Sequence, residues 1–181
     1  MDRRRFLTLA AGATGATVFG SQYWRTQYAQ AAVVAGTGPY GALQGADANG
    51  ILLPAGFTSR VIARSGQSVT GTSYTWHGAP DGGACFAGPG GGWVYVSNSE
   101  LSGGGGGASA VRFNSDGSIA AAYRILGSTS RNCAGGPTPW GTWLSCEENG
   151  SAGRVWECNP LAAGQGTRRT AMGAFNHEAA S

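Results

Sequence analysis

The sequence predicts an all-β protein with β-propeller architecture, on three observations. Short segments rich in β-branched and aromatic residues recur along the chain, and residues 93–97 alternate most clearly. Gly-rich turns separate these segments, and 33 of the 181 residues are glycine. Part of the chain repeats at a spacing of 48 residues. No segment beyond the N-terminal region has a helical period.

The predicted strands follow one another at short intervals. Residues 114–117, Asn-Ser-Asp-Gly, form the turn of a predicted hairpin, and the five glycines of 103–107 predict a flexible loop. The expected strands are 60–64, 93–97, 110–113, 119–126, 141–146, 154–158 and 169–175.

The repeat becomes visible when residues 84–100 are moved by 48 positions onto residues 132–148. Five identities result, pairing Cys85 with Cys133, Gly88 with Gly136, Pro89 with Pro137, Ser97 with Ser145 and Glu100 with Glu148. Chance identity in a Gly-rich chain is the alternative. A unit of about 45–50 residues is the size of a propeller blade. We therefore expect about three blades' worth of a larger propeller, because closed propellers hold about 4–8 blades, and expect the chain to be an N-terminal fragment.

The first residues have the pattern of an export signal. Arg3, Arg4 and Arg5 precede Phe6-Leu7, a weakly apolar run follows, and residues 29–31 form an A-x-A cleavage site. We expect a twin-arginine signal peptide over 1–31, an extended lead-in over 32–58 and a partial propeller over 59–181. The protein is then a client of the twin-arginine export machinery and periplasmic or secreted, with no stable membrane span. Without the basic signal the chain is near neutral, which argues against a nucleic-acid partner.

Residues 131–148 contain several side chains that could bind a metal ion or an anion. Glu147 and Glu148 end a predicted strand, and carboxylates are hard ligands suited to Ca²⁺ or ferric iron. Cys133 precedes Gly-Gly-Pro, so it is either a thiolate ligand or a small buried hydrophobe. Arg131 could grip an oxyanion or be a plain surface charge. Glu100, equivalent to Glu148 in the repeat, favours the metal interpretation.

Other catalytic signatures are missing from the sequence. The two histidines lack the H-E-x-x-H spacing, and neither G-x-S-x-G nor a P-loop occurs. Four cysteines in an exported protein would form one or two disulfides by default, although folding in a reducing cytoplasm before export weakens this expectation.

Several segments together resemble the PhoX-type alkaline phosphatases, in particular their shorter branch. They are the twin-arginine start and residues 47–57, 74–77, 80–83, 95–100, 131–148 and 173–179, of which the Cys-to-Glu-Glu block is the most specific. The resemblance implies a β-propeller that holds ferric iron and calcium and hydrolyses small phosphomonoesters. Because the chain is expected to be an N-terminal fragment, we expect its site to be incomplete.

The resemblance also implies roles for individual residues. Cys133 would bind iron through its thiolate, and the carboxylate ligands would be Glu100, Glu148 and Glu178, with Glu147 as a further candidate. Asn98 lies in a motif that relatives write Asn-His-Glu; here it reads Asn-Ser-Glu, so the histidine is lost. Two alternatives stay open: a calcium-dependent propeller enzyme of lactonase or phytase type, and a non-catalytic propeller that serves as a binding module.

Overall fold

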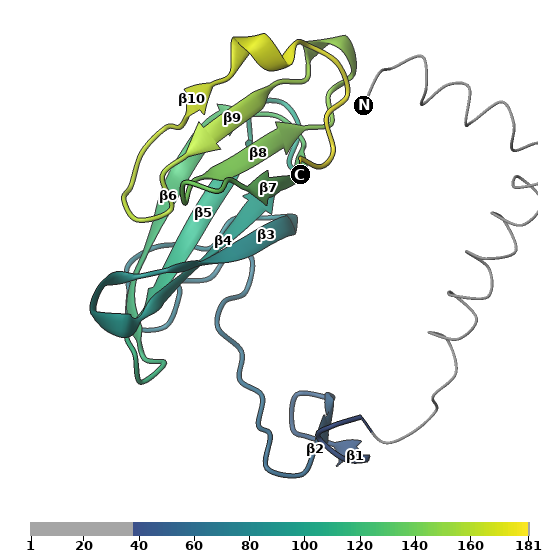
Figure 1. Cartoon of the computed structure of the whole chain (residues 1–181), viewed down its shortest axis with the longest axis vertical. Coiled ribbons are helices and arrows are strands. Elements are labelled where there is room, and N and C mark those ends of the chain that lie inside the picture. Colours follow the sequence, from purple (N-terminus) through teal and green to yellow (C-terminus); the bar gives the residue numbers. More distant parts are fainter. Residues whose placement is uncertain (1–37, 181) are drawn as a thin grey trace, which may run out of the picture. The chain divides into compact units, whose positions relative to one another are not determined.

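The chain is all-β in its computed structural model (Figure 1), which describes residues 38–180. These residues form β-strands and three short 3-10 turns, and they contain no α-helix, which confirms the all-β part of the predicted fold class. The predicted signal peptide, residues 1–31, lies outside the described residues. Among the residues described, no helix has the length and apolar character needed to cross a membrane. The chain divides into two compact units, with the boundary between Arg60 and Val61.

The described part of the first unit is a small two-stranded ribbon. Strands β1 (Leu43–Ala46) and β2 (Leu52–Pro54) pair antiparallel. The Asp47 carboxylate closes the turn between them, because its Oδ1 accepts the backbone N–H of Asn49 at 2.8 Å and of Ile51 at 3.0 Å. This ribbon lies in the segment expected to be an extended lead-in.

The second unit contains two four-stranded antiparallel sheets, each built from consecutive strands. The first has the order β3-β4-β5-β6 and the second β7-β8-β9-β10. The strands of the first are β3 (Pro80–Ala87), β4 (Trp93–Ser99), β5 (Gly106–Phe113) and β6 (Ile119–Thr129). Those of the second are β7 (Asn132–Pro137), β8 (Trp143–Glu147), β9 (Val155–Cys158) and β10 (Thr167–Arg168).

The 48-residue spacing separates equivalent strands of the two sheets. Cys85 lies in β3 and its counterpart Cys133 in β7, the first strand of each sheet. Ser97 and Ser145 lie in β4 and β8, the second strands. The two first strands, β3 and β7, also lie side by side (Figure 1). One sequence repeat therefore corresponds to one four-stranded sheet.

The apolar side chains form two cores, one on each face of the first sheet. The core between the sheets contains Val94 and Val96 of β4, Ile125 and Leu126 of β6, and Trp143 of β8. Burying each such side chain contributes roughly 1.5–3 kcal/mol. Strand β5 supplies both cores, which is why it is buried along nearly its whole length and lacks a simple alternation.

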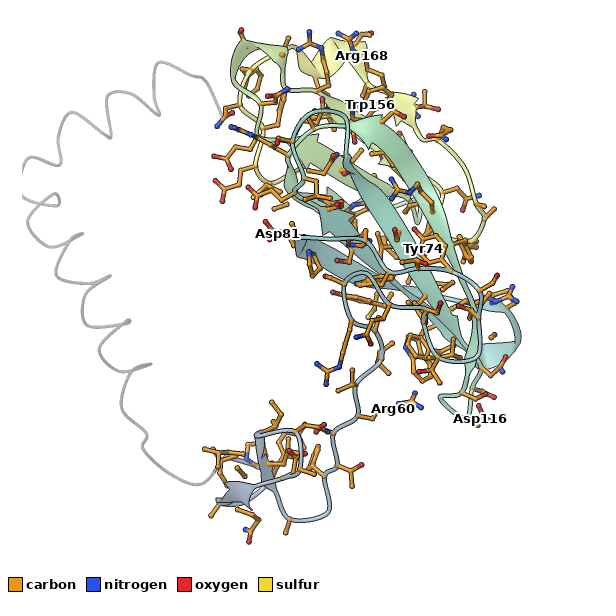
Figure 2. All side chains as sticks on the ribbon, turned by 180° about the vertical axis from the view of Figure 1, so that it is seen from behind. Arg60, Tyr74, Asp81, Asp116, Trp156 and Arg168 are labelled. Carbon is orange, nitrogen blue, oxygen red and sulfur yellow. The ribbon has the colours of Figure 1, made fainter. Side chains whose placement is uncertain are left out.

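The second core lies under the segment that precedes β3. Val69 and Trp76 of this segment pack on Val111 and Phe113 of β5, and Tyr74 lies at its edge (Figure 2). Residues 60–64, predicted as a strand, form none. The apolar pattern of this segment reflects the packing of Ile62 and Ala63 against this core, and not pairing in a sheet.

The strand predicted at 169–175 is also wrong. Arg169 extends the pairing of β9 by one bond, from its N–H to the Val155 carbonyl, and a 3-10 turn, Thr170–Met172, follows. Gly173, with φ of 79°, ends that turn. The other predicted strands coincide with β4, β5, β6, β8 and β9, although β5 begins inside the glycine run expected to be a loop.

Candidate metal centre

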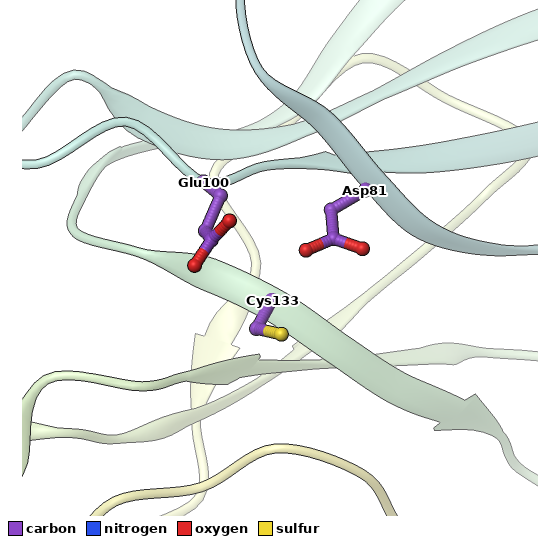
Figure 3. Close-up of side chains that lie close together, drawn as sticks. All are labelled: Asp81, Glu100 and Cys133. Carbon is purple, nitrogen blue, oxygen red and sulfur yellow. The ribbon is translucent and has the colours of Figure 1, made fainter.

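Three side chains with ligand atoms meet where the first strands of the two sheets adjoin. They are Asp81 from β3, Glu100 from the residue after β4, and Cys133 from β7. Their ligand atoms, two carboxylate oxygens and one sulfur, all lie within 4.8 Å of one another, and Figure 3 shows the side chains converging. We call Asp81, Glu100 and Cys133 the ligand cluster.

Backbone hydrogen bonds hold the three segments of the ligand cluster together. The N–H of Glu100 donates to the Ala79 carbonyl at 2.9 Å, and the N–H of Arg131 donates to the Leu101 carbonyl at 2.9 Å. Ala79 and Arg131 both adopt positive φ, 44° and 52°, a region disfavoured for side chains with a Cβ. The backbone is thus strained at both residues, Ala79 and Arg131, whose segments bond to the segment of Glu100.

Glycine allows β3 to approach β7 closely at this point. A Cβ on Gly82 would lie 2.7 Å from the Ala134 Cα and 2.9 Å from the Cys133 carbonyl oxygen, too close for any side chain. The absence of a side chain at Gly82 therefore lets β3 come close enough to β7 for Asp81 to lie near Cys133. Asp81 lies at the opposite end of the first sheet from the turn that carries Asp116 (Figure 2).

The charges of the ligand cluster disfavour a free thiolate. The pKa of the Cys133 thiol is raised to about 12, first by burial, then by the hydrogen bond and the charge of Asp81, and then by the charges of Glu100 and Glu148. The two carboxylates of the cluster are exposed, whereas Cys133 is half-buried. A bound cation would offset the mutual repulsion of the carboxylates and the thiolate. The ligand cluster therefore favours the binding of a cation.

The remaining predicted ligands lie outside the ligand cluster. Glu148 is next to it, since its charge acts on Cys133, and it accepts a hydrogen bond from Asn176 Nδ2 at 3.2 Å. Glu147 is buried, and its Oε1 accepts the backbone N–H of Ser130 at 2.8 Å. Glu178 is exposed and lines a pocket of about 650 Å³ between residues 137–140 and the C-terminal segment.

Arg131 and Asn98 also lie beside the ligand cluster. Arg131 is exposed and two residues from Cys133, and its carbonyl accepts the N–H of Glu148 at 2.8 Å. Asn98 is fully buried, and its side chain bonds the backbone of Cys133 and Ala134 rather than pointing at the cluster's ligand atoms.

Sequence reasoning did not single out Asp81 as a ligand. It stands in Pro80-Asp-Gly-Gly83, which by composition predicts a turn but forms the start of β3. The signal available was its place in the segment that precedes β4, the strand that leads into Glu100.

Among residues 38–180, the other three cysteines belong to no such group of ligand side chains. Cys85 is exposed on β3, while Cys146 and Cys158 are buried, and all four cysteines are free thiols. Burial raises the pKa of Cys146 to about 11 and that of Cys158 to about 12. Cys146 and Cys158 therefore act as small core residues.

Comparison with known proteins supports the resemblance found in the sequence. No curated protein and no solved structure matches the chain. Residues 93–153 match the family model described as alkaline phosphatase PhoX. The matched segment contains Glu100, Cys133, Glu147 and Glu148, and it begins after Asp81 and ends before Glu178. The resemblance to the PhoX-type alkaline phosphatases is thereby confirmed over the segment from β4 to the turn after β8.

Proposed function

We propose that this protein is a metal-dependent phosphatase that hydrolyses small phosphate monoesters, with iron and calcium as its cations. The observation that carries the proposal is the ligand cluster, because two of its three members lie in the segment that matches the phosphatase family. A thiol beside two carboxylates is a donor set for a metal ion, and Cys133 is the cysteine that has such neighbours.

The donor set fits iron better than calcium at Cys133. Calcium binds oxygen ligands, whereas a thiolate suits iron or other transition metals. We therefore assign iron to Cys133 with Asp81 and Glu100, and calcium to the surrounding carboxylates, for which Glu148 and Glu178 are the candidates. When bound, such cations neutralise phosphate charge and lower the pKa of a bound water.

The chain's own residues would bind and orient the substrate. Arg131 is exposed beside the ligand cluster, and a guanidinium fits phosphate oxygens bidentately. Glu147, whose Oε1 bonds the Ser130 N–H, would hold the strand ends that carry Arg131 and Cys133. The proposal thus gives Glu147 a positioning role in addition to its candidacy as a ligand.

The repeat supports a propeller as the architecture of the site. Each repeat is a four-stranded antiparallel sheet, and the first strands adjoin, as blades do around an axis. The C-terminal segment continues the pattern: the Ala180 N–H donates to the Gly135 carbonyl of β7 at 3.2 Å, on a strand that itself lies beside β3. Residues 176–180 then begin a third blade.

We also propose that the protein is exported by the twin-arginine route to the periplasm or beyond. The sequence of residues 3–7 carries this proposal. The free state of all four cysteines agrees with folding in a reducing compartment.

Metal analysis with a visible spectrum tests the function. The wild-type chain is expected to bind iron and calcium and to show a thiolate-to-iron charge-transfer band, and phosphatase activity is assayed with p-nitrophenyl phosphate. Cys133→Ser should lose the band and most of the iron. Cys85→Ser, which changes the equivalent residue of the preceding repeat, should retain both.

The other results separate the alternatives. Calcium without iron, unchanged in Cys133→Ser, would indicate a propeller enzyme of lactonase or phytase type. A folded protein that binds no metal would be a binding module and would overturn the proposed phosphatase.

A further inference from the structure

Asn98 is the most completely bonded polar side chain near the ligand cluster. Its Nδ2 donates to the carbonyl oxygens of Cys133 at 3.2 Å and Ala134 at 2.7 Å. Its Oδ1 accepts Trp143 Nε1 at 2.9 Å and Ser145 Oγ at 2.8 Å. An amide has two donors and two acceptor lone pairs, so Asn98 uses its whole capacity with no exposure to solvent.

The partners fix the orientation of the Asn98 amide. Carbonyl oxygens can only accept, so the nitrogen must face Cys133 and Ala134, and an indole N–H can only donate, so the oxygen must face Trp143. Aspartate has the same shape but no donor for the carbonyls, and an apolar residue would leave buried partners without a bond. Asparagine is therefore the side chain that satisfies this position.

The bonds of Asn98 continue into the second sheet. Ser145 Oγ, which donates to Asn98, accepts Asn132 Nδ2 at 2.9 Å, and Asn132 Oδ1 accepts Thr129 Oγ1 at 2.6 Å. All of these side chains are buried. The network joins β4 to β7 and β8, and it bonds the residues on both sides of Cys133.

The position of Asn98 in β4 relates this network to the ligand cluster. Asn98 and Glu100 are two residues apart, so along an extended chain their side chains leave on the same side. One short segment thus carries both the Glu100 carboxylate and the amide that grips the backbone of Cys133. These bonds tie the segment that carries the carboxylate to the backbone of the residue that carries the thiol.

Resting on the proposed function, we propose that Asn98 is a positioning residue that sets the Cys133 thiol against the Glu100 carboxylate for metal binding. A residue of this kind acts through the ligand it orients, and its loss typically costs about 10–100-fold in metal affinity. A merely structural asparagine would change stability and leave the affinity for iron in place.

The test compares Asn98→Asp and Asn98→Ala with Val111→Ala, all in the full chain. Val111 is fully buried in the core on the other face of the first sheet, so Val111→Ala lowers stability without touching the network. Iron titration should show binding about 10–100-fold weaker in both Asn98 variants, with a shifted or lost charge-transfer band. Val111→Ala should keep the wild-type affinity and band.

A second readout needs no metal. In metal-free protein with Cys85→Ser as background, the rate at which iodoacetamide alkylates Cys133 should change several-fold in the Asn98 variants and stay unchanged in Val111→Ala. If wild type binds no iron, the proposed function fails, while this rate still tests the positioning.

Where an Asn98 variant does not fold, Ser145→Ala, which removes one bond to Oδ1, replaces it and should show smaller shifts in the same direction. Affinity and alkylation rates equal to those of Val111→Ala would overturn the role of Asn98.

Discussion

His77 shows how one residue can tie stability to pH. The imidazole is buried, its Nδ1 lies 2.8 Å from Ser109 Oγ, and the Tyr74 hydroxyl bonds the same oxygen at 2.6 Å. Burial lowers the pKa of His77 to about 4, and the charge of Arg124 adds to the effect. The histidine is thus neutral in the folded protein at neutral pH and gains its proton only as the pH falls toward 4.

This histidine predicts a loss of stability in mild acid. Between pH 6.5 and 4 the unfolded chain binds a proton at His77 that the folded chain does not, so the free energy of unfolding falls as the pH is lowered. The fall should amount to roughly 2–3 kcal/mol and level off below about pH 4.

Urea unfolding at pH 7, 5.5 and 4 checks this expectation. His77→Gln removes the titration, so its stability should depend less steeply on pH than that of wild type. Val111→Ala lowers stability by a cavity and should keep the wild-type dependence. Parallel curves for wild type and His77→Gln would contradict the assignment.

At the scale of the strand, Gly82 predicts how closely β3 must approach β7. In Gly82→Ala the new methyl would meet the backbone of Ala134 and Cys133 at under 3.0 Å, so β3 must move away and take Asp81 with it. We expect a loss of about 1–3 kcal/mol in the free energy of unfolding and at least about tenfold weaker iron binding.

Gly164→Ala is the matched control for this prediction. A Cβ there meets its nearest atom, the Ile125 carbonyl oxygen, at 4.0 Å. It should leave urea unfolding and iron titration unchanged. If Gly82→Ala binds iron as tightly as this control, the close approach of the two strands is not what sets the distance from Asp81 to Cys133.

The same strands mark the limit of what the sequence predicts. Strand β4 was predictable because its side chains alternate between a buried and an exposed face, and the hairpin turn at 114–117 follows its composition. Strands β3 and β7 were missed because each contains a Gly pair together with Pro and with Asp or Asn, residues that favour turns. Their backbones form strands because they pair with β4 and β8, and their glycines lie against backbone atoms where a Cβ would clash. Both causes are tertiary, and the local sequence pattern does not contain them.

The site was predictable in the part that the repeat and the resemblance cover. Glu100 and Cys133 were identified in this way, and the structure brings them together. Asp81 lies in the resembling segment 80–83 but was given no role there, and the repeat does not point to it, because the residue 48 positions later is Thr129, which joins the buried network instead. The roles of Asn98 and Gly82 depend on contacts between the two sheets, which the sequence pattern does not contain.

For the whole molecule, the cysteines connect the fold to export. Cys146 and Cys158 are buried thiols whose raised pKa values keep them protonated, and the ligand cluster surrounds Cys133. A chain that folds and loads its metal before export keeps three of its four thiols away from oxidants on arrival. This order of events requires a route that carries folded proteins, as the twin-arginine route that we propose from residues 3–5 does.

The export prediction concerns the first arginine pair. Replacing both members, Arg3→Lys with Arg4→Lys, should leave the protein in the cytoplasm with its signal uncleaved, because the lysines keep the charge but not the pair of arginines that the export machinery reads. Arg5→Lys, the next residue along, keeps that pair and should be exported normally. Cell fractionation with detection of the cleaved and uncleaved forms distinguishes the two. Periplasmic, cleaved protein from the double variant would show that export follows a route for unfolded chains, and the cysteines would then meet oxidants before the fold buries them.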